Sequence, residues 1–162
     1  MAIAIGSDEA AYDLKEAIKA YLVELGEEVE DMGVYNQDPV LYPDIALAVA
    51  TAVAAGRFER GILMCGTGLG MAITANKVPG IRAATCHDVY SAERSRKSNN
   101  CQILTMGGRV VGVEVAKTVV RAWLASEFQG GRSTPKVQRM IEIDEMFHPA
   151  RKADQESSAC SD

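Results

Sequence analysis

The sequence predicts an α/β fold, a Rossmann-like three-layer α/β/α sandwich with a five-stranded parallel sheet and an extra C-terminal helix. Short apolar runs alternate along the chain with stretches whose apolar residues recur at helical spacing, which is typical of a parallel sheet covered by helices. The chain has 162 residues, of which 48% are hydrophobic, so it can bury the core of one such domain. Right-handed crossovers then favour a doubly wound sheet.

The first half of the chain supplies three strands and two helices. Residues 2–5 are apolar, with no basic region before them and no small-residue cleavage site after them, which indicates a strand and not a signal peptide. Residues 28–32 are the most polar strand candidate and are placed at a sheet edge, and residues 61–64 form the third strand. Two stripes at helical spacing lie between these strands, Leu14, Ile18, Leu22 and Leu25 before Gly26, and Ile45, Val49 and Val53 before Gly56.

The second half continues the alternation with strands at residues 81–85 and 102–106. The strongest amphipathic helix follows, with the apolar residues Val113, Ala116, Val119, Val120 and Trp123. A last helix begins near Pro135, a favoured first-turn residue, and extends through Val137, Met140, Ile141 and Phe147. We expect residues 1–150 to form a single domain and the polar residues 151–162, which lack any periodicity, to be a disordered tail.

Charge and cysteine content exclude several classes of function. The net charge is −5 and no Lys/Arg-rich run is present, so nucleic acid and anionic membranes are poor partners. No apolar stretch approaches the roughly 20 residues of a membrane span. The spacing of the four cysteines, Cys65, Cys86, Cys101 and Cys160, includes no C-x-x-C pair. This argues against a disulfide framework and against a zinc site. We therefore expect a cytoplasmic protein with free thiols.

Ligands of open parallel sheets bind beyond the carboxyl ends of the strands, so the residues that follow each strand are the candidates for chemistry. Asp8 and Glu9, both expected to bind substrate, follow the first strand, and residues 65–70 follow the third. The fourth strand is followed by His87 and Asp88, and the fifth by residues 107–109, which end in Arg109.

The loop after the third strand is the most informative of these segments. Gly66, Gly68 and Gly70 alternate with other residues, which lets the backbone turn tightly and present its amides to an anion or a developing oxyanion. Cys65 stands where the positive end of the next helix favours a reactive thiolate. A buried structural cysteine is the alternative, and the spacing alone does not decide between them. The loop matches neither the dinucleotide fingerprint G-x-G-x-x-G nor a P-loop.

Longer stretches around this loop resemble one family. Residues 65–70 (CGTGLG) continue into residues 75–83 (ANKVPGIRA), and this combination is similar to ribose-5-phosphate isomerase B and the galactose-6-phosphate isomerase subunits. Further matches are Tyr42-Pro43, residues 107–112 (GGRVVG) and residues 130–132 (GGR). The similarity extends from Ile3 to about Phe147, nearly the whole predicted domain.

This resemblance implies an aldose–ketose isomerase that works through a cis-enediol(ate) and needs neither a metal nor another cofactor. Cys65 matches the base that moves a proton between C1 and C2 of a sugar phosphate. Thr67 matches a threonine that assists proton movement on the substrate oxygens. The amides of Gly66, Gly68 and Gly70 would hold the negative charge that develops on oxygen. The chemistry suits the loop, since an enediolate needs one base and fixed donors.

The resemblance also implies substrate-binding residues and a site shared between two chains, in a homodimer or a dimer of dimers. Asp8 matches an aspartate that contacts sugar hydroxyls, Asn99 an asparagine that binds the reacting oxygens, and Tyr42 an aromatic residue that lines the site. Arg109 and Arg132 match phosphate-binding arginines, and Lys136 stands in place of another, with the charge but without the bidentate geometry. The alternatives are ordinary: Asp8 could cap a helix, and the basic residues could be solvated surface.

Two departures from the ribose-type members concern the substrate. Those members carry Asp-His after the first strand and His-Asn before the fifth, where this chain has Asp8-Glu9 and Ser98-Asn99. The second of the missing histidines is credited with opening the sugar ring, and the first contributes phosphate or substrate contacts. A tetrose phosphorylated at O4 has no hydroxyl left to close a furanose, so it needs no ring opening.

Residues 87–94 and 98–100 also resemble a branch that includes D-erythrulose-4-phosphate isomerases. The sequence therefore favours erythrulose 4-phosphate and erythrose 4-phosphate as the substrate pair, with ribose 5-phosphate and ribulose 5-phosphate as the competitor. His87 could contact substrate and take over part of the missing histidines' work, or it could be a structural residue at a helix entry, where Asp88 is a candidate cap. Cys86 and Cys101 are expected to be small buried residues.

The competing class is a non-catalytic sugar-phosphate binding protein, or a subunit that needs an unlike partner as galactose-6-phosphate isomerase does. The presence of Cys65 favours a chain that is active by itself. A flavin or nucleotide module of similar fold is a more distant alternative.

Overall fold

A single sheet of five parallel strands lies at the centre of the computed structural model, with the strand order β2-β1-β3-β5-β4. The structure describes residues 2–148, so the predicted tail at 151–162 lies outside the described residues. The predicted fold class is confirmed, as is the placement of the polar strand at an edge. The strands are β1 (Ala2–Ser7), β2 (Glu28–Asp31), β3 (Arg60–Cys65), β4 (Ala83–Thr85) and β5 (Ile103–Gly107).

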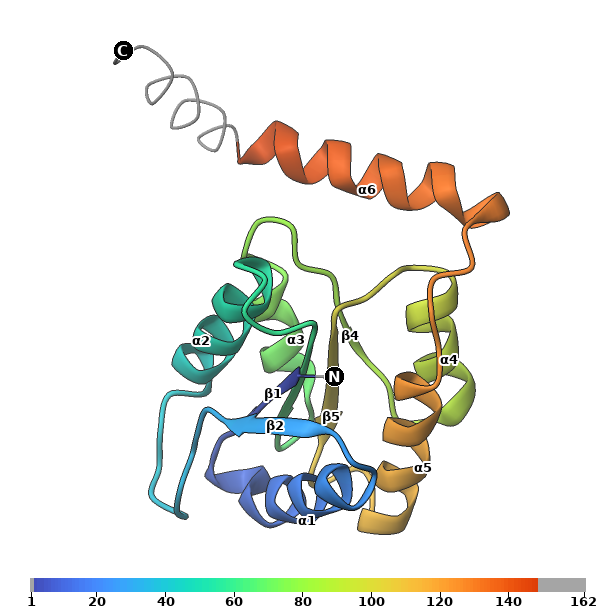
Figure 1. Ribbon diagram of the computed structural model, residues 1–162. Coiled ribbons are helices and arrows are strands. Elements are labelled where there is room, and N and C mark those ends of the chain that lie inside the picture. Colours follow the sequence, from blue (N-terminus) through green and yellow to red (C-terminus); the bar gives the residue numbers. More distant parts are fainter. Residues whose placement is uncertain (1, 149–162) are drawn as a thin grey trace, which may run out of the picture.

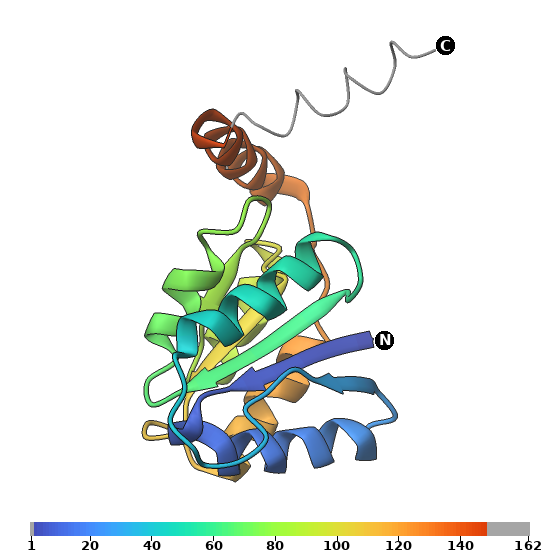
Figure 2. The ribbon, with the colours of Figure 1, turned by 90° about the vertical axis from the view of Figure 1, so that its left-hand side faces the viewer.

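Helices cover both faces of this sheet and complete the three layers (Figure 1). One face carries α2 (Tyr42–Ala54) and α3 (Leu69–Ala75), and the other carries α1 (Tyr12–Glu24), α4 (Val89–Lys97) and α5 (Val113–Leu124). The last helix, α6 (Thr134–Phe147), lies apart from these layers, beyond the turn that leads into β4 (Figures 1 and 2). Two short 3-10 helices, η1 (Glu9–Ala11) and η2 (Gly131–Ser133), precede α1 and α6.

The predicted helical stripes form the two cores. Leu14, Ile18 and Leu22 of α1 join the α5 residues in one core, and Val49 and Val53 of α2 lie in the other. Leu25 lies outside the cores at 41% exposure, because α1 ends at Glu24 and Gly26 turns the chain with a φ of +81°. The predicted stripe residues Val113, Met140 and Phe147 are exposed as well, the first at the start of α5 and the other two on α6, which lies apart from the layers. The fourth strand also begins later than predicted, at Ala83, because the amide of Arg82 is bound by the Gln102 side chain and not by a strand.

The chain reverses its direction of travel across the sheet between β1 and β3. It leaves β1 through α1 toward β2 at one edge, and it leaves β3 through α3 toward β4 at the other edge. The loops after these two neighbouring strands therefore lead away from each other at the carboxyl ends of the strands, which is where open α/β sheets bind ligands. The candidate residues at 8–9 and 65–70 lie at this topological switch point. Within residues 2–148, no helix is long and apolar enough to cross a membrane.

A buried ion cluster attaches the segment after β2 to α1. Lys15 is fully buried, and its Nζ donates to both carboxylate oxygens of Asp31 at 2.8 and 2.7 Å and to the carbonyl oxygen of Val34 at 2.6 Å. Lys19 donates to the same carboxylate at 2.7 Å. Although burial acts to raise it, the pKa of Asp31 lies below its ordinary value, because hydrogen bonds from Lys15 and Lys19 outweigh the burial. The cluster fixes where the chain leaves the sheet edge toward the site.

Replacing Asp31 with Asn is expected to lower the free energy of unfolding by about 2 kcal/mol near neutral pH, because it leaves the buried Lys15 ammonium without its main counter-charge. The folded-state pKa of Asp31 is lowered from the ordinary value of about 3.9, so its contribution is fully present above that pH and is lost as the pH falls through the folded value. Urea unfolding at fixed protein concentration should therefore show a wild-type advantage that persists at neutral pH and shrinks in acid. An advantage that is the same in acid would contradict this account.

Candidate active site

The loops that follow β1 and β3 lie side by side because these two strands are neighbours in the sheet. The amide of Asp8 donates to the carbonyl oxygen of Met64 at 3.2 Å, which places Asp8 beside the end of the strand that carries Cys65. Asp8 is 7% exposed, and its side chain makes no capping hydrogen bond to η1. Its Oδ1 finds no partner among the described residues. A buried carboxylate oxygen without a protein donor suits a ligand hydroxyl.

Burial raises the pKa of Asp8, and the neighbouring charge of Glu9 raises it further. The amides of Ala10 and Ala11 and the guanidinium of Arg109 act in the opposite direction but do not cancel these effects. Two acids thus lie side by side at the end of β1, and one of them is largely removed from water. This is the electrostatic environment expected of a group that exchanges hydrogen bonds with a polar ligand.

The loop from Cys65 to Gly70 is held against the end of β5. The amide of Gly108 donates to the carbonyl oxygen of Cys65 at 2.9 Å, and the amide of Arg109 to that of Gly66 at 3.0 Å. Gly68 has a φ of +79°, and a Cβ added there would lie 2.7 Å from the carbonyl carbon of Met106. Only glycine fits this approach, which lets the Gly68 amide turn inward and donate to the Cys65 Sγ at 3.1 Å. The contact fixes the position of the sulfur atom.

Two side chains lie over the glycines at the two ends of the loop. The Tyr42 ring packs on Gly70 so closely that an added Cβ would lie 2.5 Å from the ring and its hydroxyl. The guanidinium of Arg109 lies over Gly66. Thr67, which lies between these two glycines in the sequence, is exposed and accepts a hydrogen bond of 3.4 Å from the amide of Leu69. The expected base, aromatic residue, threonine and one phosphate-binding arginine are therefore brought together by a single chain.

Glu9 faces the segment before Tyr42. Its Oε2 accepts a hydrogen bond of 3.2 Å from the amide of Val40, a residue of the exposed 33–41 loop that connects β2 to α2. The carboxylate thus has a defined partner at the position where ribose-type members carry a histidine. The sequence could not indicate this contact, because Glu9 and Val40 are 31 residues apart.

His87 is tied to the backbone next to the loop. Its Nε2 accepts a hydrogen bond of 2.9 Å from the amide of Gly107, so this nitrogen carries no proton in the bond. This bond fits the alternative in which His87 is a structural residue at a helix entry. His87 nevertheless lies next to the end of β5, against which the Cys65 loop is held. Asp88 accepts from the amide of Ser91 at 2.7 Å and caps α4, as predicted. Cys86 and Cys101 are buried as predicted, and burial raises the pKa of each to about 11.

The remaining three candidates do not reach Cys65 within the chain. Asn99 follows α4 at the amino ends of the strands, where its carbonyl oxygen accepts a hydrogen bond of 3.1 Å from Nε of Arg82, just before β4. The 129–136 segment, which carries Arg132 in η2 and Lys136 in α6, starts beside it, since the Gln129 amide donates to the Lys97 carbonyl oxygen at 3.2 Å. Arg132 and Lys136 are exposed. One chain therefore supplies two separate sets of candidates at opposite ends of its sheet.

Ser98, the second departure, is engaged within its own helix. The guanidinium of Arg94 donates to its Oγ, one turn away along the helix. A hydroxyl held in this way is a poor substitute for a ring-opening histidine, because it does not titrate near neutral pH.

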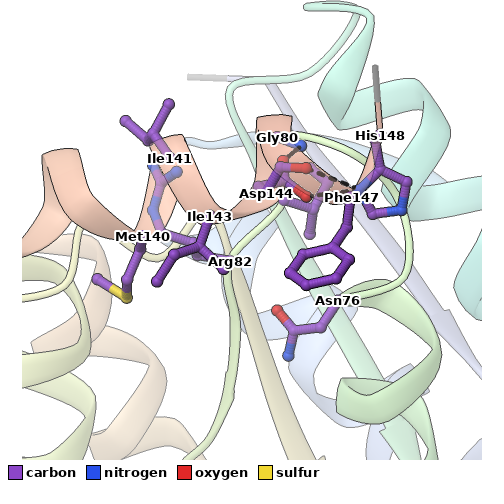
Figure 3. Close-up of a pocket in the computed structure, with 10 residues that line it drawn as sticks. Asn76, Gly80, Arg82, Met140, Ile141, Ile143, Asp144, Phe147 and His148 are labelled. Carbon is purple, nitrogen blue, oxygen red and sulfur yellow. Dashed lines mark hydrogen bonds and ion pairs between the residues drawn. The ribbon is translucent and has the colours of Figure 1, made fainter. Parts of the chain in front are cut away.

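A separate pocket of about 310 Å³ lies between α6 and the turn that precedes β4 (Figure 3). Asp144 accepts a hydrogen bond of 2.6 Å from the amide of Gly80 and one of 3.0 Å from Nδ1 of His148, as the dashed lines in Figure 3 mark. Phe147 closes one side and is 75% exposed. None of the residues lining this pocket belongs to the candidate site, so it is not the place of the chemistry.

Sequence reasoning missed two residues that support the site. Lys15 occupies a fully buried position although its neighbours suggest a solvated face, and Arg94 takes up the hydroxyl of Ser98. Neither of these roles is indicated by the residues that are adjacent in the sequence. The only hint for Lys15 is that it directly follows Leu14 of the apolar stripe.

Comparisons with known proteins agree with this geometry. Residues 3–140 match the family described as Ribose/Galactose Isomerase. The chain is 54% identical over 144 residues to D-erythrulose-4-phosphate isomerase of Pectobacterium atrosepticum, covering 86% of this chain and 93% of that protein. It is 53% identical to ribose-5-P isomerase B of Listeria innocua, covering 90% and 98%. The structure of ribose-5-phosphate isomerase B from Clostridium thermocellum superimposes with a TM-score of 0.89 at 49% identity, covering 91% and 99%.

Proposed function

Because this chain belongs to the ribose/galactose isomerase family, it is a sugar-phosphate aldose–ketose isomerase, and we propose that it interconverts erythrulose 4-phosphate and erythrose 4-phosphate with Cys65 as the base. The observation that carries the catalytic assignment is the fixed Cys65 Sγ, held at 3.1 Å from the Gly68 amide, at the end of the strand next to the one that leads into Asp8, whose buried Oδ1 has no partner among the described residues. One base and a set of fixed donors are what an enediolate reaction requires.

In the proposed reaction the Cys65 thiolate takes a proton from C1 of the ketose, and the electron pair of the C–H bond forms the C1–C2 double bond of a cis-enediolate. The C2 carbonyl oxygen gains the negative charge, which the amides of Gly66 and Gly70 stabilise, while the Gly68 amide holds the Cys65 Sγ. The thiol then returns its proton to C2 while the O1 proton moves to O2, assisted by Thr67. The product is the aldose, and no electron leaves the substrate. Asp8 binds the sugar hydroxyls, and the Tyr42 ring forms a wall of the site.

A four-carbon substrate is supported by the two departures from ribose-type members. Ser98 stands at the position of the ring-opening histidine and is held by Arg94, so it supplies no acid/base that could open a furanose. The Glu9 carboxylate, at the other departure, is engaged by the Val40 amide. A tetrose phosphorylated at O4 stays open-chain and needs no ring-opening group. The similarity to an erythrulose-4-phosphate isomerase points the same way. Ribulose 5-phosphate is the second candidate, favoured by the similarity to ribose-5-P isomerase B.

We further propose that the functional unit is a homodimer, alone or paired into a dimer of dimers, whose sites are shared. Arg109 lies over the Cys65 loop, whereas Arg132 and Lys136 lie at the other end of the sheet and are exposed. In a dimer with two-fold symmetry, these residues of one chain would meet the Cys65 loop of the other and complete a phosphate site. The three cysteines in the described part of the chain are unpaired, which supports a cytoplasmic location.

The substrate is tested by measuring kcat/KM for erythrulose 4-phosphate and for ribulose 5-phosphate with the same preparation. We expect a preference of about tenfold or more for the tetrose phosphate, because a fifth carbon must be accommodated without a ring-opening group. A clear preference for ribulose 5-phosphate would overturn the proposed substrate and leave the isomerase assignment standing. Conversion of neither sugar, with binding retained, would support the non-catalytic alternative.

A further inference from the structure

The 33–41 loop is attached to the rest of the chain unevenly. Its first residues are held by the sheet, since Ser7 donates its amide to the Gly33 carbonyl oxygen at 2.7 Å and accepts from the Val34 amide at 2.8 Å. Its middle is held by Gln37, whose side chain donates to Asp13 of α1 at 3.2 Å. These anchors leave the final stretch, which leads into α2, to be positioned by something else.

That final stretch is held by Glu9. The bond from the Val40 amide to Oε2 of Glu9 measures 3.2 Å, and across residues 2–148 no other hydrogen bond joins residues 38–40 to an element outside the loop. Glu9 itself lies in η1, which is joined to the end of β3 through the Asp8 amide. The bond thus connects a rigid part of the site to the free end of an exposed loop.

The position of the contact gives it a consequence for the ligand. Val40 precedes Tyr42 by two residues, and the Tyr42 ring lies directly on Gly70 of the Cys65 loop. Leu41, between them, is 74% exposed, so packing does little to hold this corner in place. Tyr42 is the first residue of α2, so the Val40 bond fixes the entry to the first turn of this helix, which holds the aromatic wall against the loop that carries the base. Releasing the bond would let this first turn move outward.

We propose that Glu9 is a specificity-determining residue, a latch whose hydrogen bond to the Val40 amide keeps Tyr42 close to the Cys65 loop and confines the site to a short sugar phosphate. The inference rests on the proposed function, because it concerns the length of the sugar that this isomerase accepts. A closed latch favours a four-carbon chain, and an open one admits a five-carbon chain with less discrimination.

Two substitutions remove the latch from opposite sides. Glu9→Ala removes the acceptor, and Val40→Pro removes the amide hydrogen while leaving the Glu9 carboxylate in place. Each is expected to lower the ratio of kcat/KM for erythrulose 4-phosphate over ribulose 5-phosphate by about tenfold, mainly through a higher KM for the tetrose phosphate. The double variant should shift the ratio no further than either single variant, because both remove the same bond.

Glu9→Gln is the matched control, since it keeps an acceptor oxygen and removes the charge. Its ratio is expected to stay within about threefold of the wild-type value. Hydrogen exchange of the 38–41 segment should accelerate in Glu9→Ala and not in Glu9→Gln, which reports the latch independently of turnover.

Several results would overturn the latch. The first is an unchanged ratio of the two kcat/KM values in both Glu9→Ala and Val40→Pro. The second is a change of that ratio in Glu9→Gln as large as the change in Glu9→Ala, which would show that the charge of Glu9 matters and its hydrogen bond does not. A wild-type enzyme that prefers ribulose 5-phosphate would contradict the proposed substrate, while the latch would still be judged on whether the ratio moves. If the wild-type protein converts neither sugar, the proposed function fails, and the same ratio taken from calorimetric Kd values decides on the latch.

Discussion

Cys65→Ala is expected to lower kcat by about 10³-fold, which is within the range for removing a general base that handles the reacting proton. The side chain is small and buried at the end of β3, so the fold should tolerate the change with a modest loss of stability. The variant should still bind substrate, because Asp8, Tyr42 and Arg109 keep their positions around the loop. The Kd for erythrulose 4-phosphate, measured by calorimetry on the inactive variant, is expected to stay within about tenfold of the wild-type KM.

Cys86→Ala provides the matched control for this result. Cys86 is another buried cysteine at the carboxyl end of a strand, in the core on the other face of the sheet, but burial raises the pKa of its thiol to about 11, so it stays protonated at neutral pH. Its replacement should leave kcat within about twofold of wild type, with the cost confined to packing. If Cys65→Ala retained more than a tenth of the wild-type kcat, the proton would have to be moved by another group and the loop would serve binding alone.

The parts of the fold that were predictable are those with a local cause. Periodic apolar residues such as Ile18 and Val49 can be buried only on one face of a helix, and Gly26 supplies the positive φ that ends α1. The placement of Cys65 at the carboxyl edge also follows from strand order along the chain, since parallel strands present their carboxyl ends together. Errors of one or two residues arose where a tertiary contact decides, as at Arg82, which binds Gln102 and not a neighbouring strand.

The supporting contacts were not predictable, because they join residues that are distant along the chain. The buried Lys15–Asp31 pair spans 16 residues and the Glu9–Val40 bond spans 31, and neither leaves a pattern in a single sequence. The division of the candidate site residues between the two ends of the sheet was unpredictable for the same reason. Spacing alone gave no reason to separate Arg109 from Arg132, and only the resemblance implied a second chain. The structure supplies the physical reason, which is that α4 and α5 carry the chain back to the amino ends of the strands before Asn99 and Arg132 appear.

This division makes a shared site testable by complementation. We expect Cys65→Ala and Arg132→Ala to be separately inactive at low substrate concentration, the first for want of a base and the second for want of a phosphate ligand. In a mixed dimer, one site would carry both defects and the other neither. Random reassociation of equal amounts should therefore restore about a quarter of the wild-type sites, since half of the dimers are mixed and each has one intact site.

The matched control pairs two defects from the same end of the sheet. Arg109 lies over the Cys65 loop of its own chain, so mixing Cys65→Ala with Arg109→Ala leaves one defect in every site and should restore no activity. Lys136→Ala in place of Arg132→Ala should complement Cys65→Ala, because Lys136 belongs to the other end. Recovery in the Arg109 control, or none in the Arg132 mixture although mixed dimers form, would place the complete site within one chain. The measurement thus separates an assembly that merely packs two enzymes together from one in which each chain finishes the phosphate site of its partner.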